Sequence, residues 1–286
     1  MLDHVSYRQK RTNKRPALRL GAAPSVLGLI AIFLAGCSWF SPTPAPTPPP
    51  PTYEVKSYGK IELGCGDHGH RDEPCVSFRL SWPELKGGPE SAASKINTAL
   101  LTALGFPGGP AEMEPFADAL VERWRVERKG VFYADSTWFE RRTIQVLARR
   151  PGVWSFRFDR LGHTGKEIPF DERQYLNLSP VNGSSVSLDS LLEKDAAPRL
   201  SALAEQRLRD KLDPAAGSTL PLKEARFFMP RQYALTQTGL GLLWSGDELA
   251  DPAAPRIEIT LPWSQIRDLV RKAAVNPPGP ETGSGF

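Results

Sequence analysis

The chain has 286 residues and a formal net charge of +4 at pH 7. Its first 36 residues carry +5, from six Lys and Arg against one Asp, which leaves −1 for the remainder. A nucleic-acid-binding protein needs many cations to displace the counterions of the phosphate backbone, so this charge argues against nucleic acid as a partner. The remainder, about 250 residues, is long enough for one large domain or two small ones.

The N-terminal segment has the three parts of a secretory signal: a basic stretch at residues 8–19, an apolar run at 26–34 and small residues before a cleavage point. Its end, Leu-Ala-Gly-Cys at residues 34–37, resembles the lipobox of bacterial lipoproteins, in which the cysteine is acylated and becomes the new N-terminus. A membrane-spanning helix is the alternative, but the apolar run is too short for a hydrocarbon core of roughly 30 Å. We therefore expect a signal peptide at 1–36 and palmitate at Cys37.

The residues after the lipobox predict where the domain sits. Ser38 rather than Asp follows Cys37, so we expect sorting to the outer membrane with the domain facing the periplasm. Inner-membrane retention and display at the cell surface remain alternatives. Residues 37–52 are then a Pro-rich tether in polyproline II conformation, a stiff spacer of about 3.1 Å per residue. An SH3-type ligand has the same composition but makes little sense outside the cytoplasm.

Residues 53–150 are expected to form an N-terminal α+β subdomain. The alternation of Val76, Phe78, Leu80 and Trp82 is typical of a strand with one buried face. The same patterns predict strands at 53–63, 75–82, 131–142 and 143–148, and helices at 90–104 and 115–129.

Two cysteines remain once Cys37 is assigned to the lipid. Cys65 and Cys75 form an even pair in an exported protein, where the compartment is oxidising, so we expect them to form a disulfide. The polar loop that they close holds His68 and His70, which are a partial metal site at most, because a closed zinc site needs four fixed ligands. A solvated loop is the expectation, with no metal and no cofactor.

Residues 151–273 are expected to form a second α+β subdomain, followed by a loose tail at 274–286. The patterns predict strands at 153–158, 227–229, 233–235, 239–244 and 256–261, a hairpin of 174–178 with 186–188, and helices at 189–192, 198–212 and 262–272. Strands in meanders with separate helices indicate an α+β fold with a mainly antiparallel sheet and segregated helices, built from two consecutive subdomains packed together.

This order of elements resembles a known family. Residues 174–192, 233–244 and 257–266 resemble a family of extracytoplasmic domains of unknown function, which also forms the outer part of the lysozyme-sensing anti-sigma factor RsiV and the N-terminal part of a peptidoglycan deacetylase similar to PdaC. Residues 76–85 resemble the smaller domain that often precedes it. The resemblance covers residues 53–273.

The chain departs from the family pattern in two loops. The family's Gly-Gly-Ala-His turn has as its counterpart Arg-Leu-Gly-His at residues 160–163, and the late loop, tyrosine-rich in many relatives, is 245–252 here. The resemblance implies lysozyme or peptidoglycan as ligand, but the departures leave the ligand open. Anti-sigma activity is not expected, because the segment before Cys37 reads as a leader.

The candidate binding residues lie near these loops. His163 has no accompanying nucleophile motif, so we expect it to bond backbone in a turn. Acidic side chains beside an aromatic anchor would attract a cationic protein, and paired carboxylates could alternatively serve a glycosidase. The residues in question are His163, Asp171, Glu172, Trp244, Asp247, Glu248 and Asp251.

Three classes of function remain. The first is an envelope lipoprotein whose domain binds a lysozyme-like protein or peptidoglycan. The second is a cell-wall-acting hydrolase or an accessory to a deacetylase, which would need a metal or carboxylate constellation that the sequence does not show. The third is a structural envelope lipoprotein. A binding protein that is not an enzyme fits the sequence best.

Overall fold

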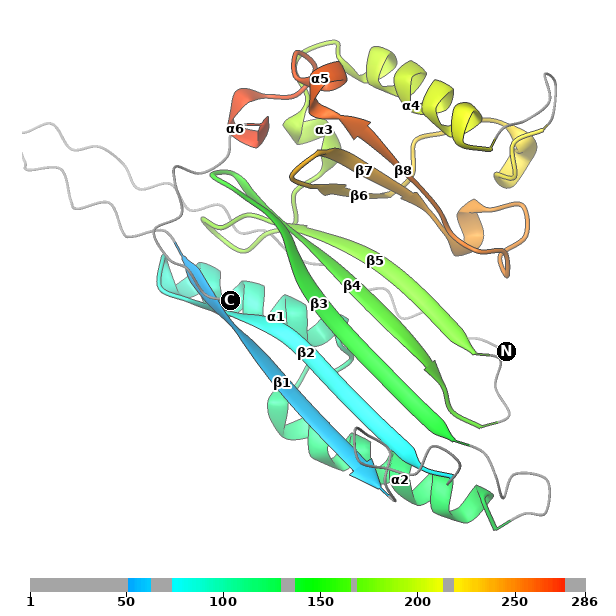
Figure 1. Ribbon diagram of the computed structural model, residues 1–286. Coiled ribbons are helices and arrows are strands. Elements are labelled where there is room, and N and C mark those ends of the chain that lie inside the picture. The colour runs from blue at the N-terminus through cyan, green and yellow to red at the C-terminus, as the bar shows by residue number, and fades with distance from the viewer. Residues whose placement is uncertain (1–50, 63–73, 130–136, 166–168, 213–218, 276–286) are drawn as a thin grey trace, which may run out of the picture. The chain divides into compact units, whose positions relative to one another are not determined.

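The computed structural model describes residues 51–62, 74–129, 137–165, 169–212 and 219–275. They contain a five-stranded sheet in the order β1-β2-β3-β4-β5 and a three-stranded sheet in the order β6-β7-β8 (Figure 1). All strand pairs are antiparallel except β2–β3, which is parallel. The predicted α+β fold with a mainly antiparallel sheet is therefore confirmed.

The larger sheet takes strands from both expected subdomains. Its strands are β1 (Thr52–Glu62), β2 (Val76–Lys86), β3 (Trp138–Arg150), β4 (Val153–His163) and β5 (Phe170–Leu178). β3 and β4 pair from Phe139↔His163 to Arg150↔Val153, so the sheet runs across the expected boundary at residue 150. The two sheets divide the chain between β5 and β6 instead.

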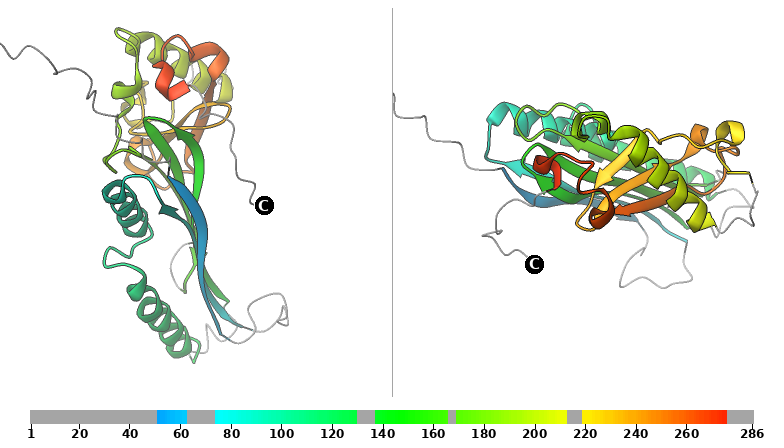
Figure 2. Two further views of the ribbon diagram at one scale, coloured as in Figure 1. Left: turned by 90° about the vertical axis from the view of Figure 1, so that its left-hand side faces the viewer. Right: turned by 90° about the horizontal axis from the view of Figure 1, so that it is seen from above.

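Helices cover one face of the larger sheet. The parallel β2–β3 pair requires a crossover, and α1 (Glu90–Ala103), η1 (Pro110–Glu112) and α2 (Met113–Glu127) provide it. Ile96 of α1 and Leu120 of α2 pack against Phe78 and Leu80 of β2 in one hydrophobic cluster. The 90°-turned view shows both helices on the same side of the strands (Figure 2).

β3 differs from its prediction. The sequence suggested separate strands at 131–142 and 143–148, of which residues 131–136 lie outside the described residues. The structure has one strand with a register shift between Val146 and Ala148. The predicted break after residue 142 lies before this bulge, where buried Glu140 and Arg142 interrupt the apolar alternation of the strand.

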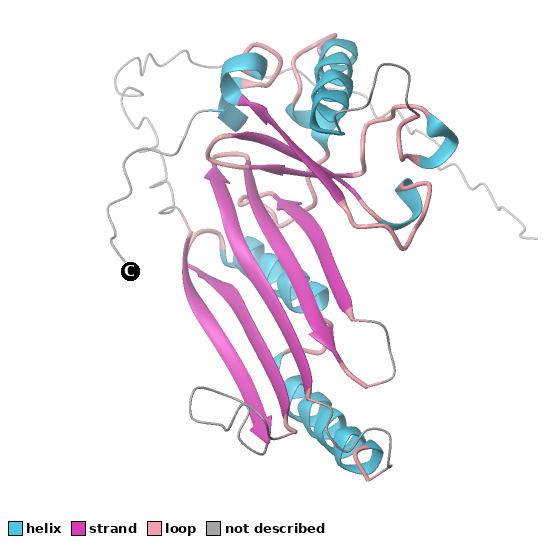
Figure 3. Ribbon diagram, turned by 45° about the vertical axis from the view of Figure 1, so that its right-hand side comes forward, coloured by secondary structure: helices cyan, strands magenta, loops and turns pink. Residues whose placement is uncertain are grey.

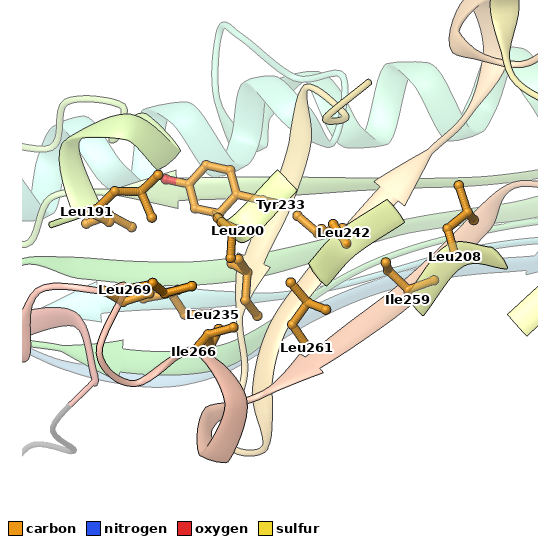
Figure 4. Packing of buried hydrophobic residues seen from close by; sticks show 14 of the residues in the cluster. Leu191, Leu200, Leu208, Tyr233, Leu235, Leu242, Ile259, Leu261, Ile266 and Leu269 are labelled. Atoms are coloured by element: carbon orange, nitrogen blue, oxygen red, sulfur yellow. The ribbon is translucent and has the colours of Figure 1, made fainter. Parts of the chain in front are cut away.

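The smaller sheet has a layer of helix over one face (Figure 3). Its strands are β6 (Gln232–Leu235), β7 (Gly239–Trp244) and β8 (Ile257–Pro262); the helices of this part are α3 (Leu188–Leu191), α4 (Ala197–Leu212), η2 (Lys223–Ala225), η3 (Gly246–Glu248), α5 (Trp263–Ile266) and α6 (Lys272–Val275). Leu200 and Leu208 of α4 pack with Leu242, Ile259 and Leu261 of the strands (Figure 4). None of the described helices is long and apolar enough to cross a membrane.

Three predicted elements of this region were wrong. Residues 186–188 form no second hairpin strand, because the one isolated bridge here pairs Leu178 with Ser185, just before them; residues 227–229 form no strand either. The helix predicted at 262–272 stops at Ile266, because the following backbone bonds elsewhere: Arg271 N donates to Leu191 O at 2.9 Å and Val270 bridges to Leu192. Tertiary hydrogen bonds here replace helical ones.

Buried polar side chains join the two sheets. Ser155 Oγ on β4 accepts a bond from Leu235 N at 3.0 Å and donates to Asn177 Oδ1 at 2.5 Å. Asn177 Nδ2 on β5 donates to the Tyr233 carbonyl at 2.6 Å. β6 is an edge strand, so these side chains bond backbone groups that an adjacent strand would otherwise take.

We expect Asn177→Ala to weaken this joint. The variant leaves the Tyr233 carbonyl and the Ser155 hydroxyl buried without their partner, which should lower the free energy of unfolding by about 1–3 kcal/mol in urea denaturation. Gln174→Ala, at an exposed position of the same strand, is the control and should change it by less than about 0.5 kcal/mol. Equal effects of the two variants would contradict a bonded joint.

Candidate functional site

The predicted turn residues near the end of β4 are part of the sheet. His163 is the last residue of β4 and is half-buried, and its Nδ1 is buried with no hydrogen-bond partner in the described structure. It therefore does not bond backbone through Nδ1, as a turn histidine would. Asp171 and Glu172 lie at the start of β5, where Asp171 Oδ1 is 2.8 Å from Arg256 Nη1 and Glu172 Oε1 is 3.3 Å from Arg160 Nη1.

The late loop does not offer the expected anchor. Trp244 is fully buried in the core of the smaller sheet and its Nε1 donates to Phe228 O at 3.0 Å, so the prediction of an exposed aromatic contact was wrong. Glu248 is also buried, accepting a bond from Arg231 N at 2.9 Å. Burying the indole ring in the core stabilises the fold more than exposing it beside the loop would, because burial removes a large apolar surface from water.

The remaining acids of this loop are exposed, and cations lie among them. Asp247 forms an ion pair with Arg231, and Asp251 Oδ1 accepts a bond from Ala253 N at 2.9 Å. A hollow of about 320 Å³ is lined by Asp247 and Glu248 together with Lys223, Glu224, Arg226, Phe228, Met229 and Arg231. Its three cations balance its three acids, so the loop does not concentrate negative charge for a cationic partner.

Several predicted site residues lie outside the described residues: Cys37, Cys65, His68 and His70. Cys75 is disulfide-bonded, and the other two cysteines, Cys37 and Cys65, both lie outside the described residues. Within the described ranges, no group of three His, Cys, Asp or Glu side chains is placed to hold a metal ion.

We expect the partner of Cys75 to be Cys65. Peptide mapping by mass spectrometry without reduction should recover one cross-linked peptide that contains both residues and no free thiol at either. A cross-link to Cys37 would contradict both the disulfide prediction and lipidation of that residue. Because Cys75 is buried, its thiol in the Cys65→Ser variant should react with a thiol reagent once the chain is unfolded in denaturant, whereas Cys75 of the unaltered, unreduced chain should not react under the same conditions.

The larger sheet has a second face that the helices do not cover. Side chains alternate across a strand, so the neighbours of buried Phe78 and Leu80 point away from the helices. Cross-strand partners share a face, and the pairs Ile61↔Ser77, Arg79↔Arg141 and Arg141↔Leu161 therefore lie side by side on the uncovered face. We call the surface formed by Ile61, Ser77, Arg79, Phe139, Arg141 and Leu161 the open patch.

Large apolar side chains are exposed on the open patch. Ile61 is 46% exposed, Phe139 38% and Leu161 42%. Each lies on a different strand: Phe139 precedes Arg141 by two residues on β3, and Leu161 is the cross-strand partner of Arg141 on β4. Apolar groups gathered in this way on a flat surface indicate an interaction site more strongly than scattered ones do.

The two arginines at its centre have no counter-charge among the residues that the structure describes. Arg79 and Arg141 are both exposed, lie directly opposite one another on β2 and β3, and form no ion pair or hydrogen bond with the described residues. Like charges opposite each other destabilise a sheet. Guanidinium groups are also the side chains best suited to hold carboxylate or phosphate. The open patch is therefore suited to bind an anion next to an apolar group.

Other arginines of the same face are neutralised. Asp159 accepts bonds of 2.7 Å from both Arg157 Nε and Arg173 Nε, and Arg173 Nη1 bonds Glu258 Oε2 at 2.8 Å. Burial alone would lower the pKa of Arg173, but these carboxylates outweigh burial and raise it. Here the smaller sheet covers β5 and supplies Glu258. Among the arginines described on this face of the larger sheet, those of the open patch therefore differ in having no ion pair.

Sequence reasoning missed the open patch but placed one residue beside it. His163 is the cross-strand partner of Phe139 and so borders the patch. The sequence did contain a signal for Arg79, because it stands between the core residues Phe78 and Leu80 in the alternating pattern of β2. Its neighbour Arg141 could not have been matched to it, because the register of two strands separated by both helices is not visible in the sequence.

Solved structures resemble this one, among them two proteins of one family. A member of the DUF3298 family from Bacteroides fragilis NCTC 9343 matches with a TM-score of 0.57 and 14% identity, over 78% of this chain and 95% of that chain. A DUF3298 family protein from Pseudomonas aeruginosa PAO1 matches with a TM-score of 0.46 and 17% identity, over 81% of this chain and 99% of that chain. No protein-family model and no curated protein matches the sequence. The fold is therefore shared with a domain-of-unknown-function protein, and at this identity the likeness extends to the fold alone.

Proposed function

We propose that this protein is an envelope lipoprotein whose domain binds peptidoglycan through the open patch. The observation that carries the proposal is the pair of unpaired arginines, Arg79 and Arg141, set among exposed Ile61, Phe139 and Leu161. The peptide stems of peptidoglycan carry carboxylates, which guanidinium groups bind in bidentate fashion. A flat sheet face suits an extended polymer better than a small molecule, which needs a concave pocket.

The charges favour peptidoglycan over a lysozyme-like protein. A cationic protein needs concentrated acid, and the acids first considered are engaged by arginines: Asp171 by Arg256, Glu172 by Arg160 and Asp247 by Arg231. The open patch is positive and would repel such a partner. The same proposal includes an extracytoplasmic location, a lipid on Cys37 and attachment to the outer membrane. These three parts depend on the sequence alone.

Binding is tested by sedimentation of the full chain with insoluble peptidoglycan. The unaltered chain should pellet, and the double variant Arg79→Gln/Arg141→Gln should bind at least about tenfold more weakly, because two charge-assisted contacts are lost. Binding should also weaken as salt rises. The matched control is Arg207→Gln/Arg267→Gln, which removes the same charge from exposed positions on α4 and after α5.

Two results would overturn this proposal. If the unaltered chain stays in the supernatant at low ionic strength, peptidoglycan is the wrong ligand. If both double variants lose binding equally, net charge and not the open patch is responsible. Titration with lysozyme under the same conditions tests the partner that the proposal disfavours, and tight binding there would reverse the order of the two ligands.

The membrane anchor is tested separately. Cys37→Ala should abolish labelling with radioactive palmitate and leave the precursor uncleaved, because acylation needs the thiol. Ser38→Asp should move the labelled protein from the outer-membrane to the inner-membrane fraction if the sorting rule holds. Palmitate labelling of the Cys37→Ala variant at the normal level would show that the lipid is attached to a residue other than Cys37.

A further inference from the structure

The opposite face of the larger sheet contains a pocket under α2. It has a volume of about 330 Å³, and its lining includes Phe116, Leu120 and Arg123 of α2. Glu140 and Arg142 of β3 and Arg160 of β4 form the other wall. These strand residues alternate with Arg141 and Leu161 of the open patch, so the pocket lies on the other side of the sheet from it.

A single carboxylate holds two of the arginines. Glu140 Oε1 accepts a bond from Arg142 Nε at 2.7 Å and another from Arg160 Nε at 2.8 Å. Glu140 is 3% exposed and Arg142 is 8% exposed, so these two groups are removed from water, whereas the side chain of Arg160 is 31% exposed. A buried charge without a partner is costly, and one carboxylate neutralises only one of the two guanidinium groups.

Arg142 is fixed in place by more than this ion pair. Its Nη1 donates to the Leu104 carbonyl, and its guanidinium carbon lies 4.7 Å from the ring centre of Phe116 and 5.5 Å from that of Phe106. A Cβ at Gly105, whose φ is +92°, would collide with Arg142 Nη1. A preorganised guanidinium loses little entropy when it binds a further group.

A third arginine stands at the mouth of the pocket. Arg123 is exposed on α2, its guanidinium carbon lies 5.1 Å from the ring centre of Trp138, and its Nη2 is 3.4 Å from the Thr164 carbonyl. These contacts leave the charge of Arg123 without a carboxylate in the described structure, since neither Trp138 nor a carbonyl carries a formal charge. The lining therefore carries three positive charges and one negative charge.

From this geometry we infer that the α2 pocket binds a small organic monocarboxylate with an apolar body. Glu172 of β5, which is not part of the lining, accepts a bond from Arg160; this reduces the excess to one positive charge and matches a single carboxylate. Phe116 and Leu120 offer apolar contact to the rest of the ligand. Arginines fixed by Glu140 bind the carboxylate without rearranging, and water is partly excluded by the rings.

The test measures binding of acetate, hexanoate and benzoate to the full chain by titration calorimetry and ligand-observed NMR. We expect benzoate and hexanoate to bind more tightly than acetate, and benzamide, which has the shape of benzoate without its charge, to bind at least about tenfold more weakly than benzoate. Arg123→Gln should weaken benzoate about tenfold. Ala119→Phe, which adds a ring to the pocket lining, should block it.

The matched control is Arg128→Gln. Arg128 lies at the end of the same helix, also over an indole ring, at 4.6 Å from the ring centre of Trp124, but outside the pocket. It should leave benzoate binding unchanged. The inference is overturned if none of the three acids binds at millimolar concentration, if benzamide binds as well as benzoate, or if Arg123→Gln and Arg128→Gln weaken binding equally. Circular dichroism of each variant shows that the fold is retained, and peptidoglycan sedimentation of the same variants separates this site from the open patch.

Discussion

The hydrogen-bonded joint between β4–β5 and β6 determines which part of the larger sheet is covered by the smaller sheet and which part stays exposed. Ser155 and Asn177 replace the strand that β6 lacks on its outer edge, and in doing so they hold the smaller sheet over β5 and one end of β4. Glu258 of β8 is thereby brought to Arg173 and to the hydroxyl of Tyr175. Burial is the larger cause and this hydrogen bond the smaller one of a raised pKa of Tyr175. The hydroxyl therefore stays protonated and donates its hydrogen to Glu258. The part of the sheet that the joint leaves uncovered is where unpaired arginines remain.

The fold could be predicted from the sequence wherever local pattern and tertiary environment agree. β2 alternates strictly because one of its faces packs on helices, and α4 shows a 3.6-residue apolar period because it lies on a sheet. The prediction failed where hydrogen bonds between segments distant in sequence replace the local helical ones. The segment after Ile266 has helical spacing, yet its backbone pairs with the start of the α3–α4 connection, which lies far away in sequence. No local pattern contains that information.

The functional residues were harder to predict than the fold, because their significance depends on what lies across the sheet. Asp247 and Trp244 were adjacent in sequence and looked like an acidic loop beside an aromatic anchor. The structure separates them, since the ring points into the core while the acid meets Arg231. Conversely, Glu140 and Arg142 occupy the buried phase of β3 between Trp138 and Ile144, where apolar residues are expected. Polar residues at core positions are a readable signal of a buried ion network.

β3 links the two candidate binding regions through adjacent residues. Arg142 enters the helix-covered side, where Glu140 and aromatic rings compensate for its lost hydration. Arg141 emerges on the uncovered side, where it meets Arg79 and no carboxylate of the described structure. A sheet selected for stability alone would gain from an acid at either position of that like-charged pair. Two exposed cations beside exposed Phe139 are thus not explained by the stability of the sheet, and their shared sign is the reason why the proposed ligand is an anionic polymer.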